Sequence, residues 1–279
     1  MRIISTSDLQ LDKEGSKRRI AKIKPMLNLE ADVLIYLGDL SDNKTNFQKG
    51  LEILAKTKAT SRFYVIGNRD LLSLEDSALT DHCDEIQERL LPFGFHLLDK
   101  KPKIVNGVGF VGNCAWYDGS LFKVPINPFS NESYPDNLVE ALRYVETHFL
   151  SAGYNIPAKL SSEDFFIHCY NLLESQLEKM TIDSRAQKIV LATHHVPLSK
   201  FVKYGKSQEY DFWNVFMGSD SFSRFFTQPK VALGLTAQTR RTENHLIGKT
   251  RVYNVGCTNE KPYHVFDDKE RYVFNLVDM

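Results

Sequence analysis

The stretch Val33–Leu37 (VLIYL) is an unbroken apolar run that ends abruptly in Gly38 and Asp39. An apolar run without alternating polar residues is typical of a strand buried on both faces of a mixed or parallel sheet. In open α/β sheets, ligands bind in the crevice outside the carboxyl ends of the strands, because short loops converge there. The run therefore predicts an α/β fold in which the Asp39 carboxylate stands at a binding site.

Other predicted strands also end in polar residues that could join Asp39. The strand that begins at Arg2 runs into Asp8-Leu9-Gln10, Arg62–Ile66 into Gly67-Asn68-Arg69-Asp70, Lys188–Thr193 into His194-His195, and Val231–Leu235 into Thr236-Ala237-Gln238-Thr239-Arg240-Arg241. Each motif alone is weak, because Gly-Asp and Gly-Asn are also common turn dipeptides. Adjacent histidines on an extended segment point in opposite directions, so we expect only one of the pair to face the crevice easily.

Apolar residues at helical spacing predict helices between these strands. The expected helices cover Ser16–Leu29 with a kink at Pro25, a segment through Phe47 and Ala55, Leu79–Leu91, Ser161–Leu177, and an aromatic-rich region from Tyr210 to Phe226. Short strands are expected at Phe95–Leu98, Ile104–Val105, Val108–Gly112, Leu246–Ile247, Val252–Val255 and Tyr272–Val277, with Gly107 in a hairpin turn. We expect a single domain over residues 1–279.

The segment from about 113 to 161 differs in character, because it combines Trp116, Tyr117 and Phe122 with several prolines. We expect a long loop plus one helix over Pro135–Leu150. Long ordered loops are often functional, so this insertion could be a cap over the site. It could equally be packing, because its aromatic side chains would be buried in both cases.

Composition excludes some classes of partner. Thirty-five basic residues balance thirty-five acidic ones, so no overall charge favours nucleic acid or a membrane surface. The first residues lack the apolar core of a signal peptide, and we expect a cytoplasmic protein. The cysteines are widely spaced without a C-x-x-C motif, which predicts reduced core thiols rather than disulfides or a zinc site.

Taken in order, the polar strand ends resemble the motifs of the calcineurin-like metallophosphoesterase family. Those motifs are D-x-H, G-D, G-N-H-D/E, a lone His and G-H-x-H, and the matching residues are Asp8, Gly38-Asp39, Gly67-Asn68, His194 and Gly234. The resemblance covers nearly the whole chain. It implies two mixed β-sheets packed face to face with helices outside, and two divalent metal ions (manganese, zinc or iron) bridged by Asp39.

Most histidines of these motifs are replaced. Gln10 stands in D-x-H, Arg69 stands where the family has its catalytic histidine, and G-H-x-H read from Gly234 loses its histidines at Leu235 and Ala237. By resemblance, one metal keeps Asp8, Gln10 and Asp39 as ligands, and the other keeps Asp39, Asn68 and His194. We therefore expect a divalent ion to bind weakly, at one equivalent at most, or not at all.

The loss of ligands bears on catalysis, because the two-metal clamp activates the attacking water and stabilises the leaving oxygen. Arg69 cannot act as a proton donor, since guanidinium stays charged, but it can bind a phosphate oxygen. Asp70, His195 and Arg240 are further candidates for substrate binding. Gln238, His195 and His245 are candidates to replace lost ligands.

These expectations leave three hypotheses open. The first is a catalytically impaired or inactive member of the fold that binds a phosphorylated ligand or a protein partner. The second is a phosphoesterase, acting on monoesters or diesters, that works with one metal at Asp39, Asn68 and His194 or with replacement ligands. The third is an interaction protein with an empty crevice. No nucleic-acid or membrane partner is expected.

Overall fold

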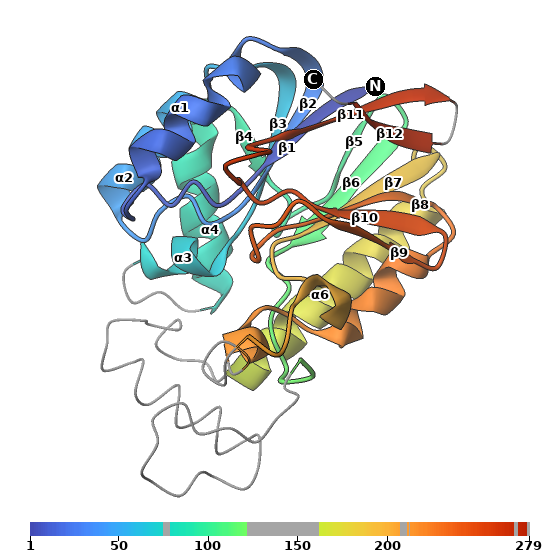
Figure 1. The fold of residues 1–279 in the computed structure, drawn as a ribbon. Coiled ribbons are helices and arrows are strands. Elements are labelled where there is room, and N and C mark those ends of the chain that lie inside the picture. Colours follow the sequence, from blue (N-terminus) through green and yellow to red (C-terminus); the bar gives the residue numbers. More distant parts are fainter. Residues whose placement is uncertain (75–78, 122–161, 207–210, 212, 271–272, 278–279) are drawn as a thin grey trace, which may run out of the picture.

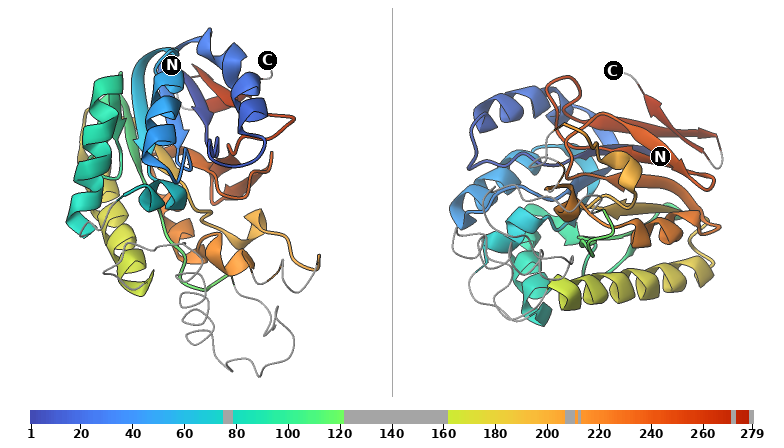
Figure 2. Two further views of the ribbon diagram at one scale, coloured as in Figure 1. Left: turned by 90° about the vertical axis from the view of Figure 1, so that its left-hand side faces the viewer. Right: turned by 60° about the horizontal axis from the view of Figure 1, so that its bottom comes forward.

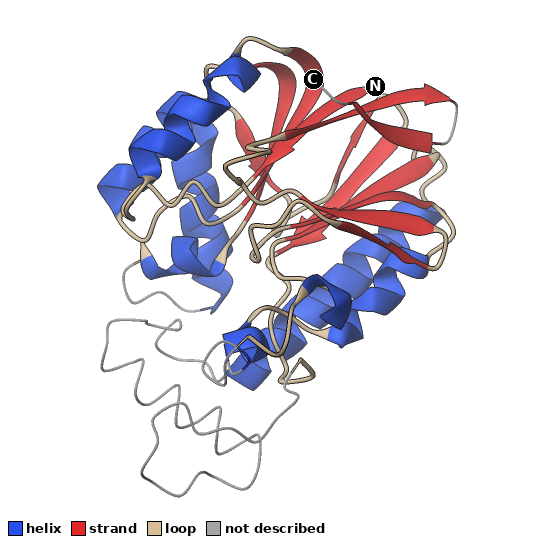
Figure 3. Ribbon diagram, viewed as in Figure 1, coloured by secondary structure: helices blue, strands red, loops and turns tan. Residues whose placement is uncertain are grey.

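The computed structural model describes residues 1–74, 79–121, 162–206, 211, 213–270 and 273–277. Most of the expected insertion, including the helix over Pro135–Leu150, lies outside these residues. The described elements form two mixed sheets of six strands each that lie against one another (Figure 1). Helices lie on the outer sides of this pair of sheets (Figure 3). The expected fold class is confirmed.

Parallel strands form the middle of each sheet, and antiparallel strands form most of the edges. The first sheet has the order β12 (Val273–Val277), β11 (His264–Glu270), β1 (Arg2–Thr6), β2 (Glu30–Leu37), β3 (Lys58–Val65), β4 (Phe95–Leu97). The second has the order β5 (Lys103–Val105), β6 (Val108–Asn113), β7 (Lys188–Thr193), β8 (Val231–Thr236), β10 (Thr250–Asn254), β9 (Asn244–Ile247). Strands β1 to β4 are parallel, as are β6, β7, β8 and β10.

Strand β2 shows why an unbroken apolar run predicted this architecture. Val33, Ile35 and Leu37 pack in the core between the two sheets. Leu34 and Tyr36 point to the opposite face and belong to the core under the helices. Successive side chains of a strand point to opposite faces, so a strand with a core on both sides is apolar at every position.

The helices cover the outer faces of the sheets. They are α1 (Ser16–Leu27), α2 (Lys44–Leu54), α3 (Asn68–Leu72), α4 (Leu79–Leu90) and α6 (Ser162–Ile182). Figure 2 shows α6, in yellow, running along the second sheet, and α6 packs on β6 there. Among the described residues, no helix combines the length and apolar composition that crossing a membrane requires.

Two local expectations differ from the structure. The first helix ends at Leu27, two residues after Pro25, instead of reaching Leu29. The described part of the region from Tyr210 to Phe226 holds short 3-10 turns, η3 (Asn214–Phe216) and η4 (Asp220–Thr227), in place of one long helix. Two further 3-10 turns are η1 (Leu91–Phe93) and η2 (Ser199–Phe201).

Strand β11 was not predicted. It pairs antiparallel with β1 on one side and β12 on the other. Its second half reads Asp267-Asp268-Lys269-Glu270, and charged residues of this kind are depleted in strands. Pairing with β1 covers His264–Asp267, and pairing with β12 extends the strand to Glu270, where composition alone does not favour a strand.

Candidate functional site

Five parallel strands bring the expected site residues to one place. Asp8 follows β1, Asp39 follows β2, and Asn68 follows β3, whereas His194 follows β7 of the second sheet. Among the described residues, Asp8, Asp39 and His194 are the one group of His, Cys, Asp or Glu whose ligand atoms all lie within 4.8 Å of one another, and all three are buried. Gln238, just after β8, completes the cluster.

The backbone around this cluster is strained. Seven described residues other than glycine have a positive φ, and five of them lie at the site: Asp8 (56°), Gln10 (41°), Asp39 (58°), Gln238 (63°) and Arg240 (46°). Residues other than glycine rarely adopt this left-handed backbone conformation, and each one lowers the stability of the fold by about 1 kcal/mol or more. Strain that gathers at one edge of the sheets is typical of a functional site.

The loops after β2 and β3 are in direct backbone contact. A Cβ atom on Gly67 would lie 2.3 Å from the Asp39 nitrogen, and one on Gly38 would lie 2.3 Å from the Gly67 nitrogen. Asp70 ties the two loops together, because its carboxylate accepts hydrogen bonds from the backbone N–H groups of Asp39 (3.0 Å), Leu40 (2.8 Å) and Gly67 (2.8 Å). Asp39 is therefore held in one orientation.

His194 presents a lone pair to several oxygen atoms. Its Nδ1 atom lies 2.6 Å from the Leu37 carbonyl oxygen, which can only accept, so Nδ1 carries the proton. The Nε2 atom lies 3.2 Å from Asn68 Oδ1, 3.2 Å from Gln238 Oε1 and 3.4 Å from Asp39 Oδ1. Although burial lowers the pKa of His194, attraction to Asp39 and Asp8 outweighs it and raises the pKa.

The atoms around His194 could hold a divalent metal ion. In the neutral ring, the unprotonated Nε2 lies 3.2 Å from Asn68 Oδ1, 3.2 Å from Gln238 Oε1 and 3.4 Å from Asp39 Oδ1. A proton on Nε2 would satisfy one or two of the three oxygens, whereas a cation would satisfy all of them. One imidazole, two amide oxygens and a carboxylate form a donor set that suits manganese, zinc or iron.

Gln10 and Arg240 lie on the Asp8 side of Asp39. Gln10 donates from Nε2 to Asp39 Oδ2 (3.2 Å) and accepts at Oε1 from Arg240 Nη1 (3.2 Å). Attraction to His194 and, more weakly, to Arg240 acts to lower the pKa of Asp8. Burial and repulsion by Asp39 nevertheless raise the pKa of Asp8 to about 6, and Asp8 Oδ1 is buried without a hydrogen-bond partner among the described residues.

Arg69 lies at the rim of the site. Its backbone N–H donates to Asp39 Oδ1 (2.9 Å), and its side-chain Nε lies 3.6 Å from Asp39 Oδ2. Its Nη1 atom pairs with Asp42 Oδ2 at 3.3 Å. Asp39 and Asp42 therefore hold this guanidinium at the rim of the site, where it remains partly exposed.

A family model, Calcineurin-like phosphoesterase, matches residues 1–233. The chain belongs to this family. A comparison with curated proteins finds no match. The fold is similar to that of phosphopantetheinyl hydrolase from Mycobacterium tuberculosis, with a TM-score of 0.66, 14% identity, and coverage of 99% of this chain and 95% of that one. A dimetal phosphatase from Danio rerio shows a TM-score of 0.46, 10% identity, and coverage of 99% and 93%.

The match to the calcineurin-like phosphoesterase family ends before Gln238 and Arg240, and the structure corrects the sequence analysis there. Leu235 and Ala237 are buried in the core between the sheets, and Gly234 packs against Phe226 and Val252. The side chains that reach the site are Gln238 and Arg240. Gln238 and Arg240, which follow the end of β8 at Thr236, are therefore the residues of this segment that reach the site.

Two expected substrate-binding residues of this calcineurin-like phosphoesterase lie behind the site. Asp70 is fully buried and its oxygens are occupied by the loops, while burial and repulsion by Asp39 raise its pKa to about 7. His195 is buried against Trp116, and burial followed by repulsion from His194 lowers its pKa to about 3. Both side chains are buried, as are Asp8 and Asp39. His245 packs on Phe201, outside the cluster.

Proposed function

We propose that this calcineurin-like phosphoesterase binds a phosphorylated ligand, a small molecule or a protein partner, at the site around Asp39 and hydrolyses phosphoesters poorly or not at all. The observation that carries the proposal is the presence of two arginines in the site. Arg69 occupies the position of the catalytic histidine implied by the family motifs, and Arg240 occupies that of a metal ligand.

Arginine changes what the site can do. A guanidinium stays charged at any relevant pH, so neither residue can pass a proton to a leaving group. Both can bind a phosphate oxygen through charge-assisted hydrogen bonds. The buried carboxylates of Asp8 and Asp39 would repel a phosphate, and the two guanidinium groups offset that repulsion. This arrangement favours binding over hydrolysis.

Orthophosphate binding measured by calorimetry tests the proposal. We expect Arg69→Gln and Arg240→Gln each to weaken binding about ten-fold or more, because each removes one charge-assisted hydrogen-bonding group. Arg185→Gln is the matched control, since Arg185 is exposed and pairs with Asp183 away from the site. The proposal is wrong if orthophosphate does not bind, or if the wild-type protein rapidly hydrolyses a simple aryl phosphodiester and Asp39→Asn abolishes that activity.

A second candidate function is a phosphoesterase that works with one metal ion. The observation that favours it is the convergence of Asn68, Gln238 and Asp39 oxygens on His194 Nε2. A metal bound there would polarise a phosphoryl oxygen. Elemental analysis of the purified protein together with the aryl phosphodiester assay separates the two candidates. One tightly bound equivalent and turnover that Asp39→Asn abolishes would replace the first proposal with the second.

A further inference from the structure

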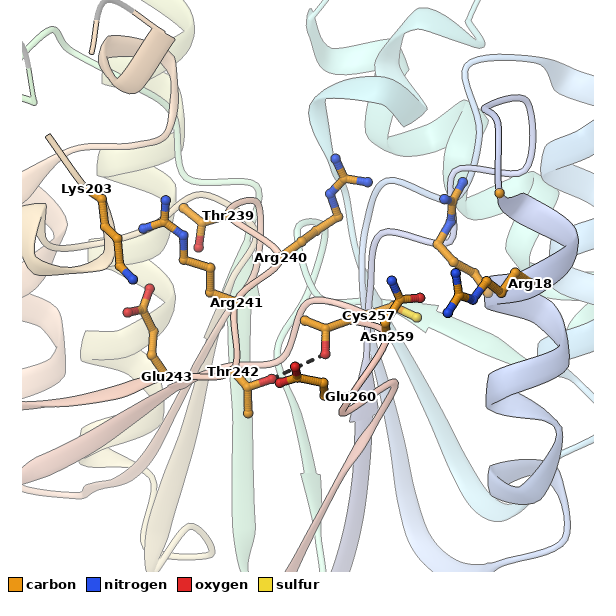
Figure 4. Close-up of a pocket in the computed structure, with 13 residues that line it drawn as sticks. Arg18, Lys203, Thr239, Arg240, Arg241, Thr242, Glu243, Cys257, Asn259 and Glu260 are labelled. Atoms are coloured by element: carbon orange, nitrogen blue, oxygen red, sulfur yellow. Dashed lines mark hydrogen bonds between the residues drawn. The ribbon is translucent and has the colours of Figure 1, made fainter. Parts of the chain in front are cut away.

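A cleft of about 720 Å³ lies beside the site and is strongly basic (Figure 4). Five cationic side chains line it: Arg18, Arg19, Lys203, Arg240 and Arg241. Only two carboxylates, Glu243 and Glu260, share the lining. The cleft is therefore a place where an anion would be attracted, in a chain whose formal net charge is zero.

Arg240 joins this cleft to the candidate site. Figure 4 shows its side chain between Lys203 and Arg241 on one side and Arg18 on the other. Its Nη1 atom donates to Gln10 Oε1 (3.2 Å), and Gln10 in turn donates to Asp39 Oδ2 (3.2 Å). Arg240 is therefore both a lining residue of the cleft and, through Gln10, a hydrogen-bonded neighbour of Asp39.

Arg19 makes its side-chain hydrogen bonds in the cleft to neutral backbone groups. Arg19 donates to the carbonyl oxygens of Leu9 (2.7 Å), Gln10 (2.8 Å) and Glu14 (3.0 Å), and these neutral groups do not cancel its charge. Burial and then repulsion from Arg240 lower the pKa of Arg19, which places the two guanidinium groups in each other's field. An anion between them would relieve this repulsion.

The size and charge of the cleft favour a small molecule. Pockets for small ligands measure roughly 300 to 1,000 Å³, and this cleft lies within that range. A nucleic acid would need an extended basic surface, and the balanced charge of the chain does not favour one. The basic residues gather instead in one bounded cleft.

We infer that the ligand is a small polyanion, an inference that rests on the proposed function. Its phosphoryl ester group would lie near Asp39 and Arg69, and a second phosphate or diphosphate group of the same molecule would lie in the basic cleft. Arg240 would contact both groups. A ligand with a single phosphate would use only half of the available charge and should bind more weakly.

Inorganic tripolyphosphate and orthophosphate, titrated into the full chain by calorimetry, test this inference. We expect the protein to bind tripolyphosphate at least about ten-fold more tightly than orthophosphate. The double variant Arg18→Gln with Lys203→Gln should lose most of this difference in affinity, while its affinity for orthophosphate should change less than about two-fold. Neither residue contacts the Asp39 cluster. The matched control is Lys17→Gln with Lys200→Gln, which removes the same charge from the same two regions outside the cleft lining.

The outcomes separate this inference from the proposed function. If both anions bind with equal affinity, or if the cleft and control variants behave alike, the inference that a second anionic group binds in the cleft is wrong. Orthophosphate binding would still support the proposed function. If tripolyphosphate binds but orthophosphate neither binds nor competes with it, the proposed function fails, and the bridging ligand fails with it.

Discussion

At the scale of single residues, the character of the site depends on four positions: Gln10, Arg69, Gln238 and Arg240. A glutamine can still offer an oxygen to a metal ion, as Gln238 does beside His194. An arginine brings a charge that opposes a metal ion and cannot be removed by deprotonation. Asp8, Asp39 and His194 therefore remain a group that could hold a metal ion, while Arg240 adds a positive charge on the Asp8 side.

Replacing these four residues together by histidine should restore a two-metal site. We expect the quadruple variant to bind two equivalents of manganese and to hydrolyse a simple aryl phosphodiester, because the imidazoles would supply the missing ligands and a proton donor. Arg69→His alone should do neither, since Arg240 would still oppose the second ion. Elemental analysis and the hydrolysis assay measure both effects.

The control variant carries histidine at Gln10, Arg69, Leu235 and Ala237 and keeps Gln238 and Arg240 unchanged. Leu235 and Ala237 are fully buried in an apolar core, so histidine there should lower the free energy of unfolding by several kcal/mol, of the order found for overpacking plus burial of an unpaired polar group. Manganese binding by this control and none by the first quadruple variant would show that the last motif begins at Gly234 after all.

At the scale of elements, the site depends on how closely the loops after β2 and β3 approach. Gly67→Ala would place a Cβ atom 2.3 Å from the Asp39 nitrogen and 2.5 Å from Asp39 Oδ1. We expect a loss of about 1–3 kcal/mol in the free energy of unfolding, as for overpacking generally, and a clear weakening of orthophosphate binding, because Asp39 must shift. Denaturant unfolding and calorimetry measure the two effects.

Gly109→Ala is the matched control for that change. Its added Cβ would meet Met180 Sδ at 2.5 Å, the far end of a flexible side chain that can move aside. We expect a smaller loss of stability and unchanged orthophosphate binding. Equal effects of the two variants on binding would mean that the contact between the loops does not orient Asp39.

At the scale of the whole molecule, stability should depend on pH through His264 of strand β11. This histidine is buried, neither ring nitrogen has a hydrogen-bond partner among the described residues, and burial followed by repulsion from Lys261 lowers its pKa from 6.5 to about 3. The unfolded chain therefore takes up the proton first as the pH falls. The contribution of neutral His264 to stability is present above pH 6.5 and is lost progressively between pH 6.5 and 3.

His264→Leu should flatten this dependence. One titrating group changes the free energy of unfolding by up to about 1.4 kcal/mol per pH unit, and the variant should lose that slope between pH 6 and 4. Denaturant unfolding at several pH values measures it. His264→Asn should flatten the curve equally, even if its stability at neutral pH differs. Curves that stay parallel to the wild-type curve would rule out His264 as the source.

The apolar pattern of the sequence by itself determined an α/β fold with a polar edge, and the resemblance to the family implied the two packed sheets and the cluster. The apolar run Val33–Leu37 required a core on both faces, and the structure has one. The polar strand ends at Asp8, Asp39, Asn68 and His194 follow parallel strands, and parallel strands deliver their carboxyl ends to one edge. These are local properties of pattern and order, so they could be read without coordinates. The cap-like insertion, a cytoplasmic location and the ligand remain predictions.

Only the tertiary structure decided which side chains fill the gaps left by the missing histidines. Strand β8 continues to Thr236, and left-handed backbone at Gln238 and Arg240 then turns these residues into the site. Gly234 suggested that the strand ends earlier. In the structure this glycine instead allows close packing against Phe226 and Val252 inside the sheet. The number of residues that a strand keeps depends on its neighbours, here β7 and β10, and a one-residue shift in a strand exchanges its two faces. For this reason the chemistry at the last motif could not be read from spacing alone.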